Sequence, residues 1–133
     1  MTASFKKFAF PLIILLIIST DQLSKHLIKT STCNKGIAFG LGQGITLVVP
    51  IVLIVILISL RGQRDQLTKA GLWLIFAGGV SNLADRLVFG CVRDFVKIGI
   101  FPAFNLADTV ITVGVLAIVY RTFKKRFVWG LDT

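Results

Sequence analysis

All six acidic residues of this chain are aspartates, and four of them lie at or just beyond the ends of apolar segments. These four are Asp21, Asp85, Asp94 and Asp108. Ionisable groups at membrane depth are costly and usually face the interior of a helix bundle, so a cluster of them needs a reason. Two carboxylates that share a site titrate as a pair, in which one keeps its proton while the other is ionised. Such a pair can activate water by general acid–base catalysis without a metal, a serine or a cysteine.

Residues that usually bind metals are scarce. The chain has one His and two Cys, which are too few and too scattered for a metal cluster, so we expect no metal and no cofactor. Nothing in the sequence brings Cys33 and Cys91 together, so we expect no disulfide between them.

The composition requires a membrane environment. Apolar residues make up 55% of the 133 residues and charged residues 16%, with a mean hydropathy of +0.85. A soluble domain of this size buries too little of its chain to hide so much apolar surface. The net charge of +9 does not indicate a nucleic acid partner, because the basic residues lie at the edges of apolar runs.

Four apolar segments have the length that crosses a hydrocarbon core about 30 Å thick. Within one membrane domain, 1–133, we place helices at about 8–28, 43–60, 68–87 and 105–121. The sequence VRDFVKIGI, which begins at Val92, alternates like an edge strand. The predicted fold class is an all-α integral membrane protein with four transmembrane helices and a small extracytoplasmic, partly β-like loop region.

The basic residues favour one orientation in the membrane. The side that holds the two termini has nine: Lys6, Lys7, Arg61, Arg64, Lys69, Arg121, Lys124, Lys125 and Arg126. The opposite side has six at most: Lys25, Lys29, Lys35, Arg86, Arg93 and Lys97. The positive-inside rule therefore places both termini in the cytoplasm and the four clustered aspartates at the outer face.

Each polar group at the outer face also has a structural explanation. The i, i+4 spacing of Asp21 and Lys25 predicts an ion pair within one helix. Arg86 is expected to pair with an acid or a lipid phosphate. Asp94 could simply face solvent, and Asp108 could serve the positive end of a helix dipole.

Small residues run along the helix side that carries Asp85. Gly71 and Gly78 precede it at intervals of seven residues. Residues without bulky side chains let another helix come close, so we expect a neighbouring helix to pack on this side.

Four sequence blocks, taken together and in order, resemble lipoprotein signal peptidase (signal peptidase II), a family of intramembrane aspartic peptidases. The blocks are TDQLSKHLI (20–28), NKGIAFG (34–40), GGVSNLADRLVFGCVRDFV (78–96) and FPAFNLADTVITVG (101–114). They match the family's Asp-Gln-x-x-Lys helix end, its Asn-x-Gly-x-Ala-Phe loop, and its Asn-x-x-Asp-Arg, Val-x-Asp-Phe and Phe-Asn-x-Ala-Asp motifs. The resemblance spans most of the chain.

The resemblance implies roles for individual residues. It assigns the catalytic pair to Asp94 and Asp108. It implies support around the substrate or the catalytic pair from Asn34, Asn82, Arg86 and Asn105. It implies structural support from Asp21, Lys25 and Asp85.

The resemblance also implies a substrate and a location. The substrate would be a bacterial prolipoprotein that carries a diacylglyceryl group, cut just before the lipidated cysteine. The enzyme would lie in the cytoplasmic (inner) membrane among its lipids, with both termini cytoplasmic and the active site at the outer face. The inhibitor globomycin is expected to bind between the two aspartates.

The segment between the first helix and Asn34 departs from the family pattern. About five residues separate the first helix from Asn34, where the family usually has a longer outer segment that forms part of a β-structured cradle, so we expect a reduced cradle.

Other functions stay open beside this resemblance. The alternative is a small four-helix transporter that uses buried aspartates, although transporters tend to hold charge near the midplane. A third interpretation is a subunit whose polar groups only join helices.

Overall fold

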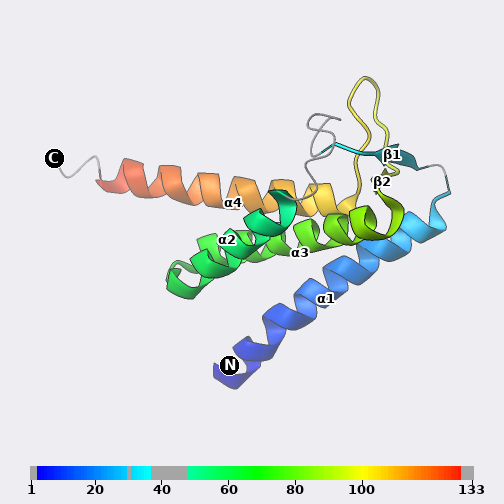
Figure 1. Ribbon diagram of the computed structural model, residues 1–133. Coiled ribbons are helices and arrows are strands. Elements are labelled where there is room, and N and C mark those ends of the chain that lie inside the picture. Colours follow the sequence, from blue (N-terminus) through cyan, green and yellow to red (C-terminus); the bar gives the residue numbers. More distant parts are fainter. Residues whose placement is uncertain (1–2, 30, 37–47, 130–133) are drawn as a thin grey trace.

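The structure is a computed structural model that describes residues 3–29, 31–36 and 48–129. Its elements within those ranges are α1 (Ala3–Leu27), β1 (Thr32–Asn34), α2 (Val48–Gly62), α3 (Gln66–Phe89), β2 (Val92–Asp94) and α4 (Leu106–Trp129). The helices pack around α3, and the two strands lie together at one end of the bundle (Figure 1). The predicted helical membrane fold with a small β-structured region is confirmed.

The bundle is apolar outside and charged inside. Leu12, Leu16 and Leu116 are 67%, 64% and 60% exposed, whereas Asp21 and Asp85 are fully buried. This distribution suits a lipid solvent, in which apolar side chains face outward and ionisable groups face the bundle interior. Over the described ranges, α1, α3 and α4 are long and apolar enough to cross a membrane, and α2 is a shorter apolar helix of 15 residues. The protein is an integral membrane protein.

The helix bounds differ from the predicted ones. α4 continues past residue 121 to Trp129, because arginine and lysine are good helix formers whose charged ends reach the membrane interface. α3 gains residues at both ends because Asp65 caps its start and Gly90, at φ +72°, ends it. α1 begins at Ala3, ahead of the predicted start. Residues 43–47 of the predicted second helix lie outside the described residues.

The small-residue side of α3 packs against α4, which confirms the expected close approach of a neighbouring helix. A Cβ atom added to Gly78 would lie 2.6 Å from the carbonyl oxygen of Ala107, and one added to Gly71 would lie 2.7 Å from that of Gly114. These backbones are therefore closer than any side chain would allow. The contact fixes α4 against the helix that carries Asn82 and Asp85.

The two strands form an antiparallel sheet in which Thr32 pairs with Asp94 and Asn34 with Val92. Beyond β2, an isolated bridge between Val96 and Phe104 closes a loop that leads into α4. The sheet is small, in agreement with the short connection between α1 and Asn34.

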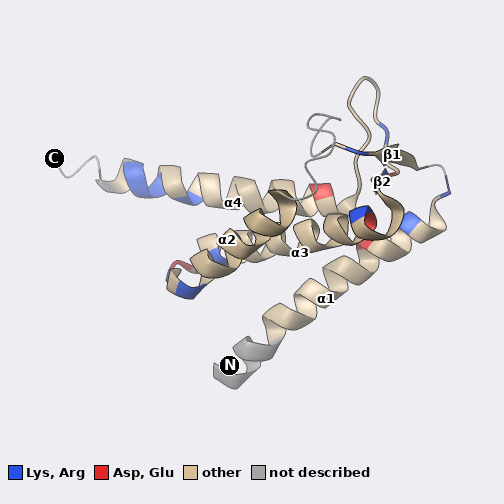
Figure 2. Ribbon diagram, viewed as in Figure 1, with Lys and Arg blue, Asp and Glu red and all other residues tan. Residues whose placement is uncertain are grey.

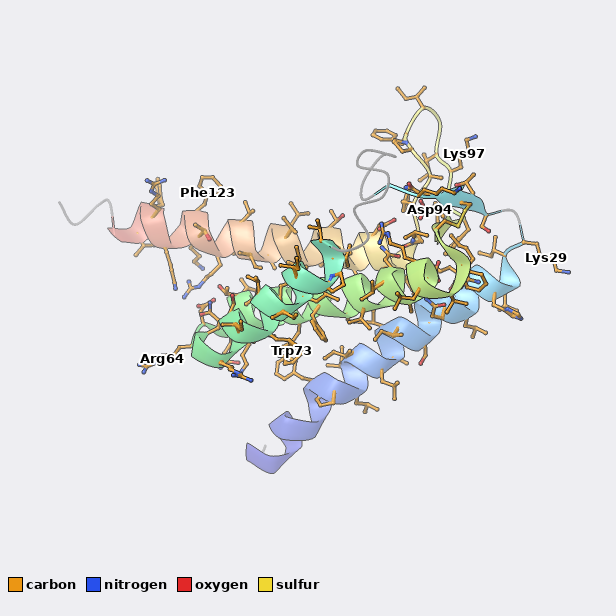
Figure 3. The ribbon with its side chains drawn as sticks, viewed as in Figure 1. Lys29, Arg64, Trp73, Asp94, Lys97 and Phe123 are labelled. Carbon is orange, nitrogen blue, oxygen red and sulfur yellow. A yellow bond between two sulfur atoms is a disulfide. The ribbon has the colours of Figure 1, made fainter. Side chains whose placement is uncertain are left out.

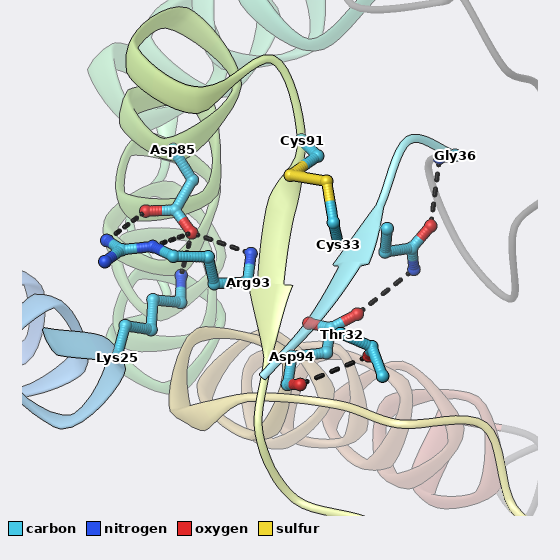
Figure 4. Close-up of a disulfide and its surroundings, with 9 residues drawn as sticks. Lys25, Thr32, Cys33, Gly36, Asp85, Cys91, Arg93 and Asp94 are labelled. Carbon is cyan, nitrogen blue, oxygen red and sulfur yellow. Dashed lines mark hydrogen bonds and ion pairs between the residues drawn. A yellow bond between two sulfur atoms is a disulfide. The ribbon is translucent and has the colours of Figure 1, made fainter. Parts of the chain in front are cut away.

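The expectation of no disulfide is wrong. Cys33 of β1 and Cys91, directly before β2, form one, with their Cα atoms 5.4 Å apart (Figure 4). Strand pairing explains the error, because the register brings together two cysteines that are 58 residues apart in sequence.

The two ends of the bundle differ in charge. Basic residues of the α2–α3 connection and of the end of α4 lie at the end opposite the strands (Figure 2). At that end Arg121 Nε lies 2.6 Å from Asp65 Oδ1 and ties α4 to the start of α3.

Candidate active site

Asp94 is held at the end of β2, with 2% of its surface exposed. Asn34 Nδ2 donates to its Oδ2 at 3.1 Å, and Asn105 Nδ2 donates to its Oδ1 at 2.8 Å. Thr32 Oγ1 donates to its main-chain oxygen at 3.2 Å (Figure 4). Both carboxylate oxygens are thus fixed by amides, and the solvent-facing alternative for Asp94 is wrong because the residue is buried.

Asp108 lies in the first turn of α4, where the helix dipole favours a negative charge. Asn105 and Asp108 bond reciprocally across this turn. The Asp108 N–H donates to Asn105 Oδ1 at 2.9 Å, and the Asn105 N–H donates to Asp108 Oδ2 at 3.2 Å. Asn82 Nδ2 donates to the other oxygen, Asp108 Oδ1, at 2.8 Å. This arrangement is a capping box in which Asn takes the place of Ser or Thr and Asp that of Glu.

Asn105 therefore joins the two aspartates. Its fully buried side chain donates to Asp94 Oδ1 and also to Asn82 Oδ1, at 3.1 Å, while Asn82 holds Asp108. The two carboxylates belong to one hydrogen-bond network and come from a strand and a helix that are separated by a loop. Two acids in this relation fit the paired general acid–base chemistry that the sequence suggests.

The environment of Asp94 favours its protonated form. Burial, and after it the charge of nearby Asp108, raises the pKa of Asp94 to about 6 from an ordinary value of 3.8. The hydrogen bonds from Asn34 and Asn105 act in the opposite direction, since they stabilise the carboxylate. Such a pKa allows Asp94 to exchange a proton near neutral pH.

The buried cation of Lys25 supports the residues that hold Asp94 and Asp108. Lys25 Nζ lies 2.6 Å from Asp21 Oδ2, which confirms the predicted i, i+4 ion pair, and donates to Asn82 Oδ1 at 3.0 Å. Asp21 in turn accepts from Ser81 Oγ at 2.6 Å and from the Ala107 N–H at 2.9 Å. Because the Ala107 N–H belongs to the first turn of α4, α1 helps to set the place where α4 begins.

Asp85 holds β2 at the residue before Asp94. Its Oδ2 accepts from the Arg93 N–H at 2.9 Å, and its Oδ1 accepts from Arg93 Nη2 at 2.9 Å (Figure 4). Lys25 Nζ lies 3.4 Å from the same carboxylate, and Gln22 donates to it at 3.0 Å. A supporting role was expected for Asp85, whereas Gln22, Ser81 and Arg93 were not predicted to belong to the site. All three lie next to predicted site residues in the sequence, which is the signal that could have found them.

Arg86 binds a main-chain oxygen in place of the expected acid. Its Nη2 donates to the main-chain oxygen of Gly36 at 2.6 Å, and its side chain is buried. Asn34 Oδ1 accepts from the Gly36 N–H at 2.9 Å, so Arg86 and Asn34 hold the same peptide segment. A bend in a peptide segment exposes the carbonyl groups of that segment. An arginine side chain, which has several N–H donors, can therefore hold the segment.

A pocket of about 170 Å³ opens beside these residues. Its walls are Ser24, Phe95, Val96, Asn105, Leu106 and Thr109. The volume is well below the roughly 300 Å³ of a small-ligand site, so the pocket has room for a single side chain of a larger substrate.

Comparison with known proteins assigns the chain to a family. The sequence model described as "Signal peptidase (SPase) II" matches residues 13–124, which include every residue named above as part of the site. The chain belongs to the signal peptidase II family. It is therefore a peptidase by family, and this membership argues against the transporter and the structural subunit.

Individual relatives agree with this signal peptidase II assignment. The lipoprotein signal peptidase of Moorella thermoacetica is 34% identical over 84% of this chain and 91% of its own length. That of Staphylococcus haemolyticus is 37% identical over 80% of this chain and 73% of its own. Two solved structures of a bacterial membrane enzyme are 30% identical, with TM-scores of 0.75 and 0.72. Each covers 87% of this chain, and the chain covers 88% and 93% of theirs.

The structure brings the residues predicted for a signal peptidase II site to one end of the bundle. Asn34, Asn82, Asn105 and the two aspartates form one hydrogen-bond network. Asp21, Lys25 and Asp85 form a second, buried layer that touches the first through the Lys25–Asn82 contact, and Arg86 holds Gly36 beside both. In the described part of the chain, every buried polar side-chain atom has a hydrogen-bond partner.

Proposed function

We propose that this protein is an aspartic endopeptidase that removes signal peptides from diacylglyceryl-modified bacterial prolipoproteins. It cuts just before the lipidated cysteine, and Asp94 and Asp108 are the catalytic pair. The observation that carries the proposal is the network in which Asn105 bonds both aspartates, in a chain that belongs to the signal peptidase II family.

The reaction needs one proton shared by the two aspartates. The ionised carboxylate takes a proton from a water molecule, whose oxygen attacks the scissile carbonyl carbon. The protonated carboxyl group gives its proton to the carbonyl oxygen, and a tetrahedral intermediate forms without a covalent link to the enzyme. The intermediate then collapses and the C–N bond breaks. The carboxyl group that took the proton from water gives it to the leaving amine, while one hydroxyl proton of the intermediate returns to the other carboxylate, so the pair again holds one proton.

The supporting residues keep this pair in position. Asn34 and Asn105 fix the orientation of Asp94, while Asn82 and the capping turn fix that of Asp108. Amide donors leave the charge of the pair unchanged, so they orient the carboxylates without forcing both of them to ionise. Asp21, Lys25, Asp85 and Arg86 act one step further away, on the helices and strands that carry the pair.

The charge distribution supports a bacterial cytoplasmic membrane in which both termini are cytoplasmic and the site lies at the outer face. The signal peptide of a substrate can then lie as a helix against the bundle, while the diacylglyceryl chains on the cysteine of that substrate remain among the membrane lipids. The pocket beside Asn105 has room for one substrate side chain. Globomycin is expected to bind between Asp94 and Asp108.

Cleavage of a diacylglyceryl-modified prolipoprotein, followed as a gel shift, tests the proposal. Asp94→Asn and Asp108→Asn keep the shape of each side chain but remove its proton exchange, so each variant is expected to lose at least about 100-fold in rate. Asp65→Asn is the matched control, because Asp65 lies at the opposite end of the bundle, and this variant is expected to cut normally. Unfolding temperatures in detergent establish that each variant is folded.

Two results would contradict the proposal. One is an inactive wild type. The other is a folded Asp94→Asn or Asp108→Asn variant with near-normal activity. Asp85→Asn measures how far the site extends. Because Asp85 holds the peptide before Asp94, we expect a partial loss of cleavage rather than a complete one.

A further inference from the structure

The loop between Val96 and Phe104 presents three large apolar side chains outside the helices. Ile98, Ile100 and Phe101 are 57%, 100% and 67% exposed. The loop has a defined shape, since the Phe101 N–H donates to the Ile98 oxygen at 3.0 Å across a turn. Gly99 takes φ +54° in this turn, a conformation that glycine adopts without strain. The side chains are thus held outward by a turn that glycine makes possible.

The loop projects sideways from the bundle. In Figure 1 it leaves the strand end of the molecule at a steep angle to α3 and α4, rather than continuing along their axes. Figure 3 shows Lys97 on this projection near Asp94, with Arg64 at the opposite end of the bundle. Because α3 and α4 are long and apolar enough to span the membrane, a sideways projection at their end runs along the membrane surface.

We propose that this loop, residues 97–103, inserts its tip into the lipid leaflet at the Asp94 end of the bundle. The three apolar side chains would lie among the upper parts of the acyl chains, as in proteins that bind membranes through apolar side chains at the interface. Lys97 is exposed, and its ammonium group can reach a lipid phosphate while its stem follows the apolar layer. The loop has no acidic residue that would oppose an anionic headgroup.

The chemistry of the tip favours lipid over a protein partner. A patch that combines a fully exposed isoleucine and a largely exposed phenylalanine with a single cation is a liability in water. At a bilayer surface the same combination satisfies both the acyl region and the phosphate layer. The bundle that bears the loop is itself surrounded by lipid, so the contact needs no further component.

Insertion of the loop also positions the catalytic pair, Asp94 and Asp108, relative to the lipids. The bridge that closes the loop joins Val96, two residues after Asp94, to Phe104, which is next to Asn105. The two ends of the loop therefore continue into one catalytic aspartate and into the residue that joins the pair. A tip that is fixed in the leaflet therefore fixes the height of the dyad relative to the lipids, and so relative to a cysteine whose diacylglyceryl chains lie in the same leaflet. This consequence rests on the proposed function, whereas the insertion itself does not.

Fluorescence of an Ile100→Trp variant tests the insertion directly. The two natural tryptophans are replaced, as Trp73→Phe and Trp129→Phe, and the protein is placed in phosphatidylcholine–phosphatidylglycerol vesicles. Some vesicles contain lipids brominated near the top of the acyl chains. We expect these lipids to quench the new indole strongly, and acrylamide to quench it several-fold less than free tryptophan. Leu116→Trp, at an exposed position within α4, serves as a control that must be lipid-quenched.

Two outcomes would overturn the insertion. One is full quenching by acrylamide with no effect of brominated lipid, which would place the tip in water. The other is protection from both quenchers, which would mean that the loop folds onto protein, either its own bundle or a second copy.

Cleavage by Ile100→Asp then tests the consequence. A charged tip should lower kcat/KM for prolipoprotein in vesicles by about tenfold relative to Ile100→Leu. This is the effect expected if the substitution removes roughly half of the free energy gained by burying one isoleucine side chain. Equal activity of the two variants would refute the link between insertion and the dyad. If the Ile100→Trp variant is quenched by brominated lipid as expected but the wild type cuts nothing, the proposed function fails while the insertion stands.

Discussion

Asn34→Ala provides the sharpest test of how the strands tune the site. Asn34 donates to Asp94 Oδ2 at 3.1 Å, and this bond stabilises the ionised carboxylate. Without it the charged form loses a donor in a buried place, so the pKa of Asp94 must rise above its present value of about 6. The substitution leaves β2, Asn105 and Asp108 in place.

The size of the shift follows from the strength of the bond. A hydrogen bond to a charged group contributes about 1 kcal/mol more than one to a neutral group, and one pKa unit corresponds to about 1.4 kcal/mol. The pKa of Asp94 should therefore rise by about 0.7 unit. If Asp94 must be ionised to act as the base, the acidic limb of the cleavage profile moves up in pH. If it must be protonated to act as the acid, the alkaline limb moves up. The limb that moves therefore identifies the role of Asp94.

The measurement is the pH profile of kcat/KM for a diacylglyceryl-modified substrate between about pH 4.5 and 9, a window that brackets the Asp94 pKa of about 6 and its expected rise. Thr32→Val is the matched control, because Thr32 lies on the same strand but donates to the main-chain oxygen of Asp94. Its profile should keep the wild-type limbs. A profile of Asn34→Ala that coincides with the wild type, or moves to lower pH, would refute the reasoning.

Two further predictions concern the supports of the site. Reduction of the disulfide, or the double variant Cys33→Ser/Cys91→Ser, should lower both the unfolding temperature and the cleavage rate, because the bridge ties β1 to the start of β2. Its 58-residue separation corresponds to about 4 kcal/mol in the chain-entropy description, and an unfolding temperature that does not respond to reductant would contradict this. Gly78→Ala should destabilise the bundle by about 1–3 kcal/mol, since the new Cβ would lie 2.6 Å from the Ala107 oxygen. Gly62→Ala, with no atom within 4 Å, is its control, and equal thermal shifts for the two variants would show that the helix contact is looser than described.

The buried ion network has a structural logic of its own. Asp21, Lys25, Asp85 and Arg93 carry two negative and two positive charges, so the layer next to the dyad is neutral overall. A buried pair stabilises little against an apolar replacement, but loss of one partner leaves an uncompensated charge at high cost. The layer therefore acts by fixing geometry: it connects α1, α3, β2 and the first turn of α4 beside the hydrogen-bond network that holds Asp94 and Asp108.

Local sequence was enough for the membrane character and for the faces of the helices. Apolar runs define the helices because each residue contributes to transfer into lipid independently of the fold. The i, i+4 spacing of Asp21 and Lys25 and the seven-residue spacing of Gly71 and Gly78 are properties of a single helix, and both predictions hold. Helix ends were less certain, since caps such as Asp65 and Gly90 act through a few atoms that hydropathy does not register.

Contacts between distant segments needed the tertiary structure. The disulfide was missed because the register of β1 on β2 is set by pairing across 58 residues, which no local pattern encodes. Arg86 was expected to bind an acid, but its side chain reaches a main-chain carbonyl, and main-chain groups are identical in every sequence. The same holds for Arg93, whose own N–H bonds Asp85. The sequence determined which side chains could do chemistry at one end of the bundle, and packing decided which atoms they meet, because hydrogen bonds depend on positions to within tenths of an ångström.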